Sequence, residues 1–334
     1  RVSPIVDSDG EVTHFVGVQN DVTERKRSEQ HLRFINNAAN DLLELTDEDS
    51  VYDYVGRKLA GLLEKAIIVI NKKQSDTHLI NQGIYGLDET LLGRAMKLLG
   101  YSPEGHRYPI HPDTQRYFGS ENLLQFDGTL TDWVQDVVPS TITRQLEKWA
   151  KINRLYFIGL QKHDELFADV QIYTRGEAAI KYPDLIEAFI RHASTSLARI
   201  RVEGNLRESE QRYRALFDDS QNLVFLHDFE GKFIDANDAA LRLLGYERKD
   251  ILNLDFKSLL EPDDLSQVAV VLEVIRETGR QKEPLTFKLR AHDGEIIYVE
   301  TMSSVIQQNS EPPIIQGIAR DITKQKRTHD NLQA

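Results

Sequence analysis

The sequence predicts an α+β fold in which antiparallel sheets are joined by long, coiled-coil-like helices. Pairs of alternating apolar strands meet at turn signals such as Asp293-Gly294, which is typical of β-hairpins. Apolar residues recur at heptad-like spacing between about residues 182 and 217. The strand-to-helix segment DVTERKR, Asp21–Arg27, is written again as DITKQKR at 321–327, in the same register.

Composition bounds the class of protein. A chain of 334 residues exceeds one compact core, so we expect two or three domains. Charged residues at 28% and hydrophobic residues at 40% are typical of a soluble globular protein. The net charge of −12 argues against a nucleic-acid partner, because phosphate binding needs a basic surface.

The absence of cysteine excludes several kinds of site, and the hydropathy of the chain argues against a membrane span. The chain has no cysteine, which removes disulfides, thiolate metal sites and thioether-linked chromophores. No apolar run reaches the ~20 residues that span a bilayer, so we expect no membrane contact within this segment and a cytoplasmic location. Because the first residue is Arg, we interpret the sequence as a piece of a longer chain whose membrane anchor, if any, lies elsewhere.

The first elements are a hairpin and a helix. Two alternating strands flank Asp9-Gly10, and two strands alone are only marginally stable, so they look like the end of a domain whose beginning is missing. Thr23 is the predicted N-cap of the next helix. Its apolar residues have heptad-like spacing, which fits either a coiled-coil seam or an ordinary packed helix: Leu32, Ile35, Ala39 and Leu42.

The next segment alternates helices and strands. A helix over about 49–64 carries Val51, Val55, Leu59 and Leu62 on one face, and the apolar run 66–70 predicts a central strand. DETLLGRAMKLLG predicts a helix closed by Gly100. Residues 101–128 show no clear period. RLYFIGL and LFADVQIY, joined by QKHDE, predict a hairpin.

A long helix follows, from residue 182 or 184 to about 217. Its apolar residues keep one heptad register up to Ile200: Ile186, Ile190, Ala193, Leu197 and Ile200. Beyond Gly204 the register moves to another set: Val202, Leu206, Ser209, Tyr213 and Leu216. Such a phase shift indicates either a stutter in a coiled coil or the end of one helix and the start of another.

The last hundred residues are regular. A hairpin turns at Glu230-Gly231, and Asn237 is a candidate cap for the helix DAALRLLGY. Pro262 precedes a helix that ends at Gly279. A second hairpin turns at Asp293-Gly294, and IIQGIARDIT is the final strand before a helix that starts at Thr323.

The stretches ESEQRYRALFDDS, GKFIDANDAALRLLGYERKDILN, LLEPDDL, HDGEIIYVE and GIARDITKQKR resemble, in this order, a PAS domain with its PAC-type end. The segment SPIVDSDGEVTHFVGVQNDVTERKRSE looks like the end of another PAS domain. AIIVI, RLYFIGLQ, LFADVQIY and the flanking long helices resemble a GAF domain, although residues 101–150 depart from its usual loop lengths. The whole order is similar to the sensory region of multidomain sensor histidine kinases, with those of methanogenic archaea the nearest resemblance.

The resemblance implies a division of the chain. Residues 1–23 would be the remnant of a truncated PAS domain, and 24–46 a linker helix leading into a GAF domain over 30–203. Residues 204–322 would be a PAS domain with its PAC end, and 323–334 the start of an exit helix. In this family the Asp-x-Thr triplet joins the last strand to the signalling helix.

Four residues are therefore expected at signal-transmission junctions: Asp21, Thr23, Asp321 and Thr323. A threonine cap and an aspartate near the positive end of a helix would also occur for stability alone, at ~1 kcal/mol. The two interpretations are compatible.

The sequence predicts no catalytic and no phosphoacceptor residue. His192 and His31 lie on helices, but neither is followed by the His-Glu and Thr-Pro pattern that a kinase phosphoacceptor helix resembles. No Gly-rich phosphate-binding loop, G-x-S-x-G or H-E-x-x-H motif occurs. Whether the segment belongs to an enzyme stays open, and the resemblance implies that its parent is a histidine kinase (EC 2.7.13.3).

No cofactor and no metal is predicted. In haem-binding PAS domains the proximal histidine lies on the helix after the PDD turn, and LSQVAVVLEVIRETG has none. A flavin adduct needs a cysteine. His227 is a possible pocket residue, but we expect a packed or rim histidine.

Two further patterns in the GAF-like region are rejected as binding sites. Asn71-Lys72 fits the start of the pattern that cyclic-nucleotide binders resemble, but Leu87 stands where Phe is expected and Asp-Glu is displaced. His106 and His111 have no third ligand nearby that would make a metal site.

We therefore expect a sensory and signal-relay region that forms a parallel homodimer along its helices. It would bind an unidentified small molecule or partner and act on a kinase core in the parent chain. Two alternatives stay open: the regulatory region of a cyclase, phosphodiesterase or transcription regulator, and a ligandless dimerisation spacer.

Overall fold

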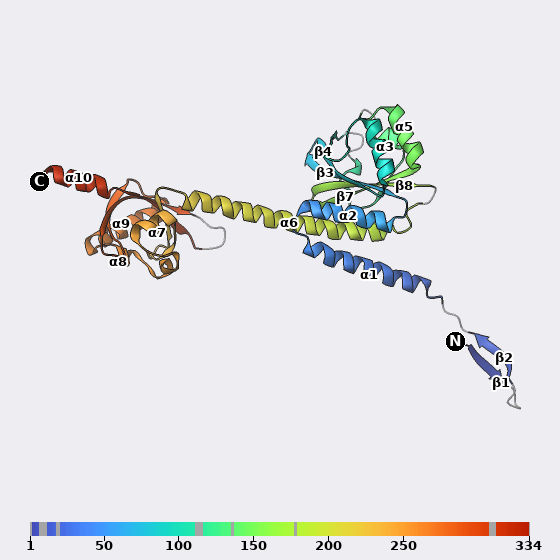
Figure 1. Ribbon diagram of the computed structural model, residues 1–334. Helices are drawn as coiled ribbons and strands as arrows, with labels where there is room; N and C mark the ends of the chain where they lie inside the picture. The colour runs from blue at the N-terminus through green and yellow to red at the C-terminus, as the bar shows by residue number, and fades with distance from the viewer. Residues whose placement is uncertain are drawn as a thin grey trace. The chain divides into compact units, whose positions relative to one another are not determined.

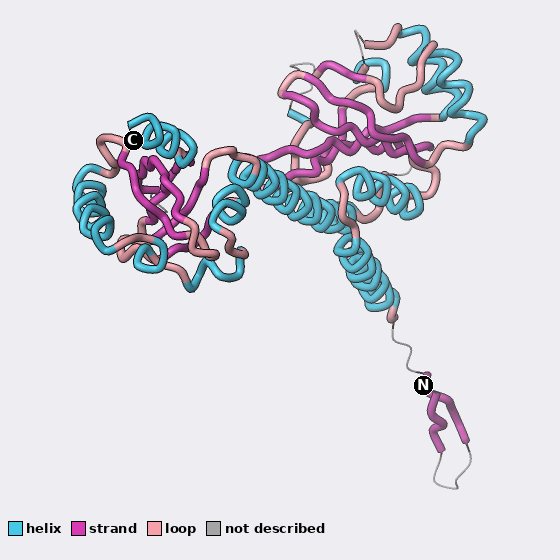
Figure 2. The backbone as a smooth tube through the Cα atoms, turned by 60° about the vertical axis from the view of Figure 1, so that its left-hand side comes forward, coloured by secondary structure: helices cyan, strands magenta, loops and turns pink. Residues whose placement is uncertain are grey.

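The chain divides into two compact units, residues 1–204 and 205–334, and each is described by itself. All three sheets of the described chain are antiparallel and are accompanied by helices, which confirms the α+β class (Figures 1 and 2). The computed structural model describes residues 2–6, 12–17, 21–110, 116–134, 137–176, 179–306 and 312–333.

The first unit begins with a two-stranded hairpin and a helix. Strand β1 (Val2–Val6) pairs with β2 (Val12–Gly17), and Val2 lies opposite Gly17. The predicted turn at Asp9-Gly10 lies outside the described residues. Helix α1 (Thr23–Glu44) buries Ala38 and Leu42, while Leu32 is exposed, so its C-terminal half is an ordinary packed helix.

A six-stranded sheet organises the rest of the first unit. Its order is β5-β4-β3-β8-β7-β6, so the predicted strand 66–70 does lie inside the sheet and the predicted hairpin is β7 with β8. Strands β4, β5 and β6 were not predicted; the last two have only three residues and show no alternation. The strands are β3 (Ile67–Ser75), β4 (His78–Tyr85), β5 (Arg107–Pro109), β6 (Leu124–Phe126), β7 (Ile152–Lys162) and β8 (Glu165–Arg175).

Helices cover both faces of this sheet, with α2 and α6 on one face and α3 and α5 on the other (Figure 1). The helix predicted over 49–64 is α2, and the helix predicted to close at Gly100 is α3, where Gly100 has the left-handed φ of 79° that favours glycine. The helices are α2 (Glu48–Leu62), α3 (Glu89–Leu99), α4 (Leu130–Trp133), α5 (Ser140–Ala150) and α6 (Pro183–Asp218).

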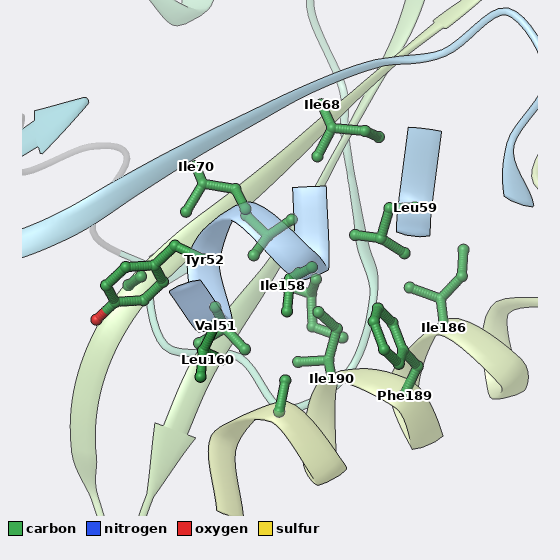
Figure 3. Packing of buried hydrophobic residues seen from close by; sticks show 14 of the residues in the cluster. Val51, Tyr52, Leu59, Ile68, Ile70, Ile158, Leu160, Ile186, Phe189 and Ile190 are labelled. Atoms are coloured by element: carbon green, nitrogen blue, oxygen red, sulfur yellow. The ribbon is translucent and has the colours of Figure 1, made fainter. Parts of the chain in front are cut away.

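The main core lies between the sheet and helices α2 and α6 (Figure 3). The predicted face of α2 points into it, with Val51, Val55 and Leu59 fully buried. Phe189 of α6 and Ile68 of β3 pack in the same cluster. Since burying one large aliphatic side chain contributes ~1.5–3 kcal/mol, this cluster is the main source of stability in the unit.

Helix α6 is continuous over 36 residues, so the alternative of two separate helices is wrong. The first apolar register is buried in the main core: Ile186, Ile190, Ala193, Leu197 and Ile200. Beyond it, Leu206, Tyr213 and Leu216 are exposed, at 59%, 51% and 75%. In the described part of the chain, no helix combines the length and the apolar character needed to cross a bilayer.

The second unit is built on a five-stranded sheet of order β10-β9-β13-β12-β11. Both predicted hairpins are present, β9 with β10 and β11 with β12, and the predicted final strand β13 lies between β9 and β12. The strands are β9 (Leu223–His227), β10 (Phe233–Ala236), β11 (Leu285–Arg290), β12 (Ile296–Ile306) and β13 (Ile314–Asp321).

The helices of this unit include one at each predicted position. Asn237 caps α7 as predicted, since its side chain accepts a hydrogen bond from the Ala240 N–H. Pro262 is the first residue of α9 rather than the residue before it, which suits a proline because that N–H has no helical partner. The helices are α7 (Asp238–Leu244), the 3-10 helix η2 (Arg248–Asn253), α8 (Phe256–Leu259), α9 (Pro262–Thr278) and α10 (Thr323–Gln333).

Candidate functional site

A cavity of about 80 Å³ lies within the core of the second unit. Its wall combines the sheet with α7, η2, α8 and α9, and it is almost wholly apolar. Strand β12 contributes Val299, Thr301 and Ser303, because alternate residues of a strand face the same side. The cavity is therefore in direct contact with the strand that pairs with the last strand, β13.

His227 is buried, as predicted, but it also lines the cavity, which was the less favoured alternative. Its side chain is 2% exposed, and its ring lies 4.7 Å from that of Phe256. Nδ1 lies 2.7 Å from the Asp228 carbonyl oxygen, so Nδ1 carries the proton and donates it. Burial lowers the pKa of His227, so the ring is neutral at pH 7 and its Nε2 is an acceptor.

Gln281 adds a buried amide to the wall. Its Nε2 donates to the carbonyl oxygens of Glu283 and Thr301, at 2.7 and 3.0 Å. These two bonds hold the buried side chain against β12. The cavity thus offers few polar groups, and it is smaller than the ~150 Å³ cavity that accommodates benzene in a protein core. It has room for water or for a ligand of a few heavy atoms.

The predicted exit junction lies where β13 passes into α10. Asp321 Oδ1 accepts a hydrogen bond from the Thr323 N–H at 2.8 Å. Thr323 Oγ1 accepts from the Tyr298 N–H of β12 at 3.0 Å, and the Ile322 N–H donates to the Tyr298 carbonyl at 2.9 Å. The start of α10 is therefore bound to β12, one residue from Val299 of the cavity wall.

An ion pair adds to this attachment. Arg327, one turn into α10, donates from Nη2 to Glu295 Oε1 at 2.9 Å. Both side chains are more than half exposed, so the pair contributes at most ~1 kcal/mol. The ion pair therefore helps to orient α10 and adds little to stability.

The N-terminal junction has the same local geometry. Asp21 Oδ1 accepts from the Thr23 N–H at 2.8 Å, and hydrogen bonds to Thr23 lower the pKa of the Asp21 carboxyl. Helix α1 begins at Thr23, but the residue before it is Val22 and no side chain caps the helix there. The prediction of Thr23 as N-cap is therefore wrong: the aspartate two residues earlier accepts the hydrogen bond.

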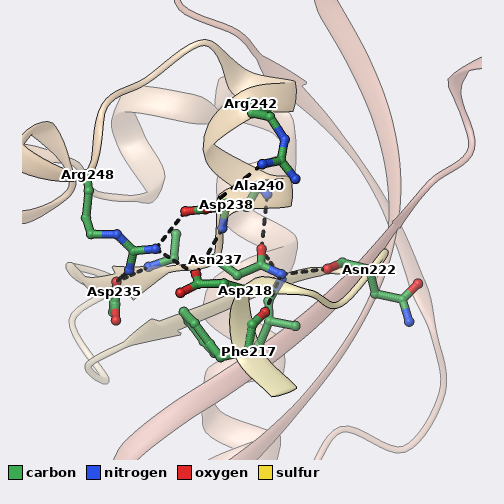
Figure 4. A network of polar contacts seen from close by, with 11 residues as sticks. Phe217, Asp218, Asn222, Asp235, Asn237, Asp238, Ala240, Arg242 and Arg248 are labelled. Carbon is green, nitrogen blue, oxygen red and sulfur yellow. Dashed lines mark hydrogen bonds and ion pairs between the residues drawn. The ribbon is translucent and has the colours of Figure 1, made fainter. Parts of the chain in front are cut away.

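Asn237 connects the entry to the second unit with its sheet (Figure 4). It is fully buried, and its Nδ2 donates to the carbonyls of Phe217 and Asn222, both at 2.9 Å. Its Oδ1 accepts from the N–H groups of Val224 and Ala240, both at 3.0 Å. All four hydrogen-bonding positions of the amide are used, and they join the end of α6 to β9 and α7.

Arg248 makes a second connection at the same place (Figure 4). Its guanidinium pairs with Asp218 at 2.7 Å, Asp235 at 2.8 Å and Asp238 at 2.9 Å. These carboxylates raise the pKa of Arg248 against the opposing effect of burial. The sequence did not single out Arg248, because its three partners are 10 to 30 residues away in the chain.

The histidines considered as phosphoacceptors or ligands lie apart from these junctions. His192 is exposed on α6, and His31 packs edge-on against Tyr182 at 4.6 Å. His106 stacks on Tyr101 at 4.0 Å, and His111 lies outside the described residues. Among the described residues, no group of three metal-ligating side chains is close enough to hold an ion.

The residues of the rejected cyclic-nucleotide pattern serve other contacts. Lys72 pairs with Glu48 at 2.9 Å, which places its ammonium toward α2. Asn71 is buried, and Leu87 lines a cavity in the first unit that is described below.

Comparison with known proteins bears on the second unit. Residues 221–324 match the family model described as PAS domain, so this unit contains a PAS domain. The chain is similar to the sensor histidine kinase TmoS of Ectopseudomonas mendocina, with 27% identity over 128 residues that cover 38% of this chain and 13% of TmoS. It is also similar to the methyl sulfide methyltransferase-associated sensor of Methanosarcina acetivorans, with 24% identity over 138 residues that cover 40% of this chain.

The chain spans 13% of the length of each of these curated relatives. Among solved structures, the PAS domain of an HTR-like protein from Haloarcula marismortui has 23% identity and a TM-score of 0.33, covering 36% of this chain and 98% of that one. A domain of a sensory box sensor histidine kinase/response regulator from Geobacter sulfurreducens has 28% identity and a TM-score of 0.30, covering 35% and 96%.

Proposed function

We propose that the chain is the sensory and signal-relay region of a two-component sensor histidine kinase. The PAS domain is the input module of the second unit, and the kinase core belongs to the parent chain. The names of the curated relatives, a sensor histidine kinase and a sensor, support this assignment. The relay would run from the cavity through β12 to α10.

The exit junction is the observation that carries the proposal. Thr323 accepts from the Tyr298 N–H, and Tyr298 precedes Val299 of the cavity wall. A change in the cavity that moves β12 therefore acts on the first turn of α10 through hydrogen bonds. A helix that begins on a sheet in this way can have two arrangements, and a ligand that favours one of them shifts the population.

We propose further that the first unit is a GAF domain over 30–203, preceded by a PAS remnant over 1–23 and the linker helix 24–46. The six-stranded antiparallel sheet with α2 and α6 on one face supports this assignment. In the same scheme the second domain covers 204–322, and 323–334 begins the exit helix. Asp21 and Thr23 would connect the remnant to the linker helix.

A parallel homodimer along α6 is part of the proposal. The exposed apolar residues Leu206, Tyr213 and Leu216 recur at heptad-like spacing on this helix. An apolar stripe of that kind is what a second copy of the same helix would cover. The dimer would bring two exit helices together before the kinase core.

The test is a chimera in which the full 334-residue chain is fused through α10 to the dimerisation and catalytic core of a histidine kinase. We expect Asp321→Ala and Thr323→Val each to change autophosphorylation by at least about threefold, because the first removes the acceptor of the Thr323 N–H and the second removes the hydroxyl that bonds to Tyr298. The control is Thr328→Val, on the exposed side of α10, where the hydroxyl only donates back to the Lys324 carbonyl.

If both junction variants and the control give the activity of the unmodified chimera, the chain is a spacer and the relay is wrong. That result would favour the ligandless dimerisation role.

A further inference from the structure

A second and larger cavity, of about 260 Å³, lies in the first unit on the face of the sheet that α2 and α6 do not cover. Its walls come from β3, β4, β5, β7 and β8 and from α3, α4 and α5. Most of the lining is apolar, and aromatic rings contribute on several sides, among them Tyr101, Tyr108, Trp133 and Trp149.

The part of the wall formed by the sheet is polar. Asn71, Asn81, Gln171 and Tyr173 line the cavity, and none is more than 7% exposed. Asn71 lies directly opposite Asn81 on β4 and Asp169 on β8, so the three side chains are neighbours across three strands. Asp169 is fully buried one hydrogen bond behind Gln171.

Hydrogen bonds fix the orientation of this polar wall. Gln171 Nε2 donates to Asp169 Oδ2 at 2.6 Å, and the Tyr173 hydroxyl donates to Gln171 Oε1. Asn81 Nδ2 donates to Asn71 Oδ1 at 2.9 Å. Among the described residues, Asn81 Oδ1 and Asp169 Oδ1 have no hydrogen-bond partner.

Two buried acceptors without donors are costly, and most buried polar atoms in proteins are paired. Asn81 of β4 and Asp169 of β8 flank Asn71 of β3 on one face of the sheet, and Asn81 lines the cavity. A ligand that presents N–H donors would pair with the Asn81 acceptor. Such a ligand would supply the donor that the Asn81 oxygen lacks among the described residues.

The charged groups around the cavity narrow the class of ligand. No lysine, arginine or histidine of the described chain lines the cavity, so a phosphate or carboxylate would find no counter-ion. The carboxyl group behind the wall belongs to Asp169, and the phenol of Tyr173 interacts electrostatically with it. The surrounding aromatic faces favour a cation as well.

We propose that this cavity binds a small organic cation with an apolar body, whose N–H groups donate to Asn81 and whose charge is attracted by Asp169. The inference rests on the sensory role proposed above for the first unit and names its ligand class. Because a cavity of ~150 Å³ accommodates benzene, one of about 260 Å³ has room for roughly ten heavy atoms. Amidines and amines with one ring are of this size.

The test uses the intrinsic fluorescence of the full chain. Trp133 and Trp149 are its only two tryptophans, and both line this cavity, whereas none lines the cavity of the second unit. Benzamidine, benzamide and benzoate are titrated as probes of one shape and different charge. We expect a saturable change with benzamidine, binding at least tenfold weaker with benzamide, and none with benzoate.

Variants of the cavity residues test whether the ligand binds at this wall. Asn81→Leu should weaken benzamidine binding at least tenfold, and Ala95→Phe should abolish it by filling the cavity from α3. Asp169→Asn should remove the preference for benzamidine over benzamide. Its matched control is Asp164→Asn, an exposed carboxylate at the turn of the same hairpin, which should leave the preference unchanged.

Three results would each overturn the proposal: no saturable change with benzamidine, equal binding of benzoate, or an Asp169→Asn variant that keeps the full preference. Should Asp169→Asn fail to fold, the ligand series and Asn81→Leu still decide. Because binding is read from tryptophan, these outcomes do not depend on kinase activity and are distinct from a failure of the relay.

Discussion

Asp169 has two opposite effects: it would attract the proposed ligand, and its burial lowers the stability of the first unit. It is fully buried, and burial raises the pKa of its carboxyl from 3.8 to about 7, against the opposing effect of the hydrogen bond from Gln171. A folded-state pKa above the unfolded one means that stability is greatest below about pH 4 and is lost as the pH rises through about 7. Above that range the ionised carboxylate is a constant cost.

Asp169→Asn should therefore stabilise the first unit at pH 8, by ~2–4 kcal/mol on the scale of 1.36 kcal/mol per pKa unit. It should also flatten the pH dependence of stability between about 4 and 7. Urea unfolding followed by tryptophan fluorescence measures this, because both tryptophans lie in the first unit. A variant less stable than wild type at pH 8, with Asp164→Asn unchanged, would contradict the account.

Asn237 is the residue on which the entry to the PAS domain depends most. Truncation to alanine removes four hydrogen bonds, and two of the lost partners, the Val224 N–H and the Phe217 carbonyl, belong to buried residues. We expect Asn237→Ala to destabilise the second unit by ~2–4 kcal/mol, since each unsatisfied buried group costs ~1–3 kcal/mol.

Hydrogen exchange of peptides from β9 and α7 would measure this loss. Asn253→Ala, an exposed asparagine at the end of η2, is the control and should leave exchange unchanged. Equal protection in Asn237→Ala and in the control would show that the connection is dispensable.

At the scale of elements, sequence patterns predicted the central strand β3 and four hairpins, β1–β2, β7–β8, β9–β10 and β11–β12, but not β4, which pairs with β3. They succeeded where period and turn residues agree, as in β11 and β12 around Asp293-Gly294. They missed β5 and β6, because three residues are too few to show alternation. The Thr23 cap was wrong because an aspartate two residues earlier is an equally good acceptor, and only geometry distinguishes the two.

The polar wall of the first unit was also missed, for a different reason. Because β8 is buried on both faces, LFADVQIY has the pattern of a wholly apolar strand. The sequence therefore does not show which of its residues form a polar face. The available signal was Asp169 alternating with Gln171 inside such a run, where charged residues are rarely buried without a partner. Residues such as Arg248 gave no signal, because their partners meet only in three dimensions.

The exit junction gives a prediction for one element. Thr323→Val removes the acceptor of the Tyr298 N–H, so the first turn of α10 should lose its attachment to β12. We expect faster hydrogen exchange at Tyr298 and in residues 323–327, with the pairing of β12 and β13 beyond Thr301 unchanged. Thr328→Val is the control, and equal exchange in the two variants would contradict the role of Thr323.

At the scale of the whole molecule, the proposed dimer depends on the exposed stripe of α6. Leu216→Glu places a charge on a leucine that is 75% exposed, so it should not disturb the core but should separate the two copies. Light scattering should then give a mass near 38.3 kDa instead of twice that value. Leu252→Glu, on an exposed leucine of η2, should leave the dimer intact.

A wild-type monomer at tens of micromolar would contradict the dimer, and the exit helices would then have to act without forming a pair. A dimer that survives Leu216→Glu would show that the copies do not associate along this stripe of α6.

The central claim is that the sheet of the PAS domain sets the orientation of α10 and that this orientation determines output. The most direct test inserts one to seven residues after Gln333 in the kinase chimera and measures autophosphorylation. Because an α-helix turns once in 3.6 residues, we predict activity that rises and falls with insert length and recovers at seven residues. Activity that is constant, or that falls steadily with length, would contradict the claim.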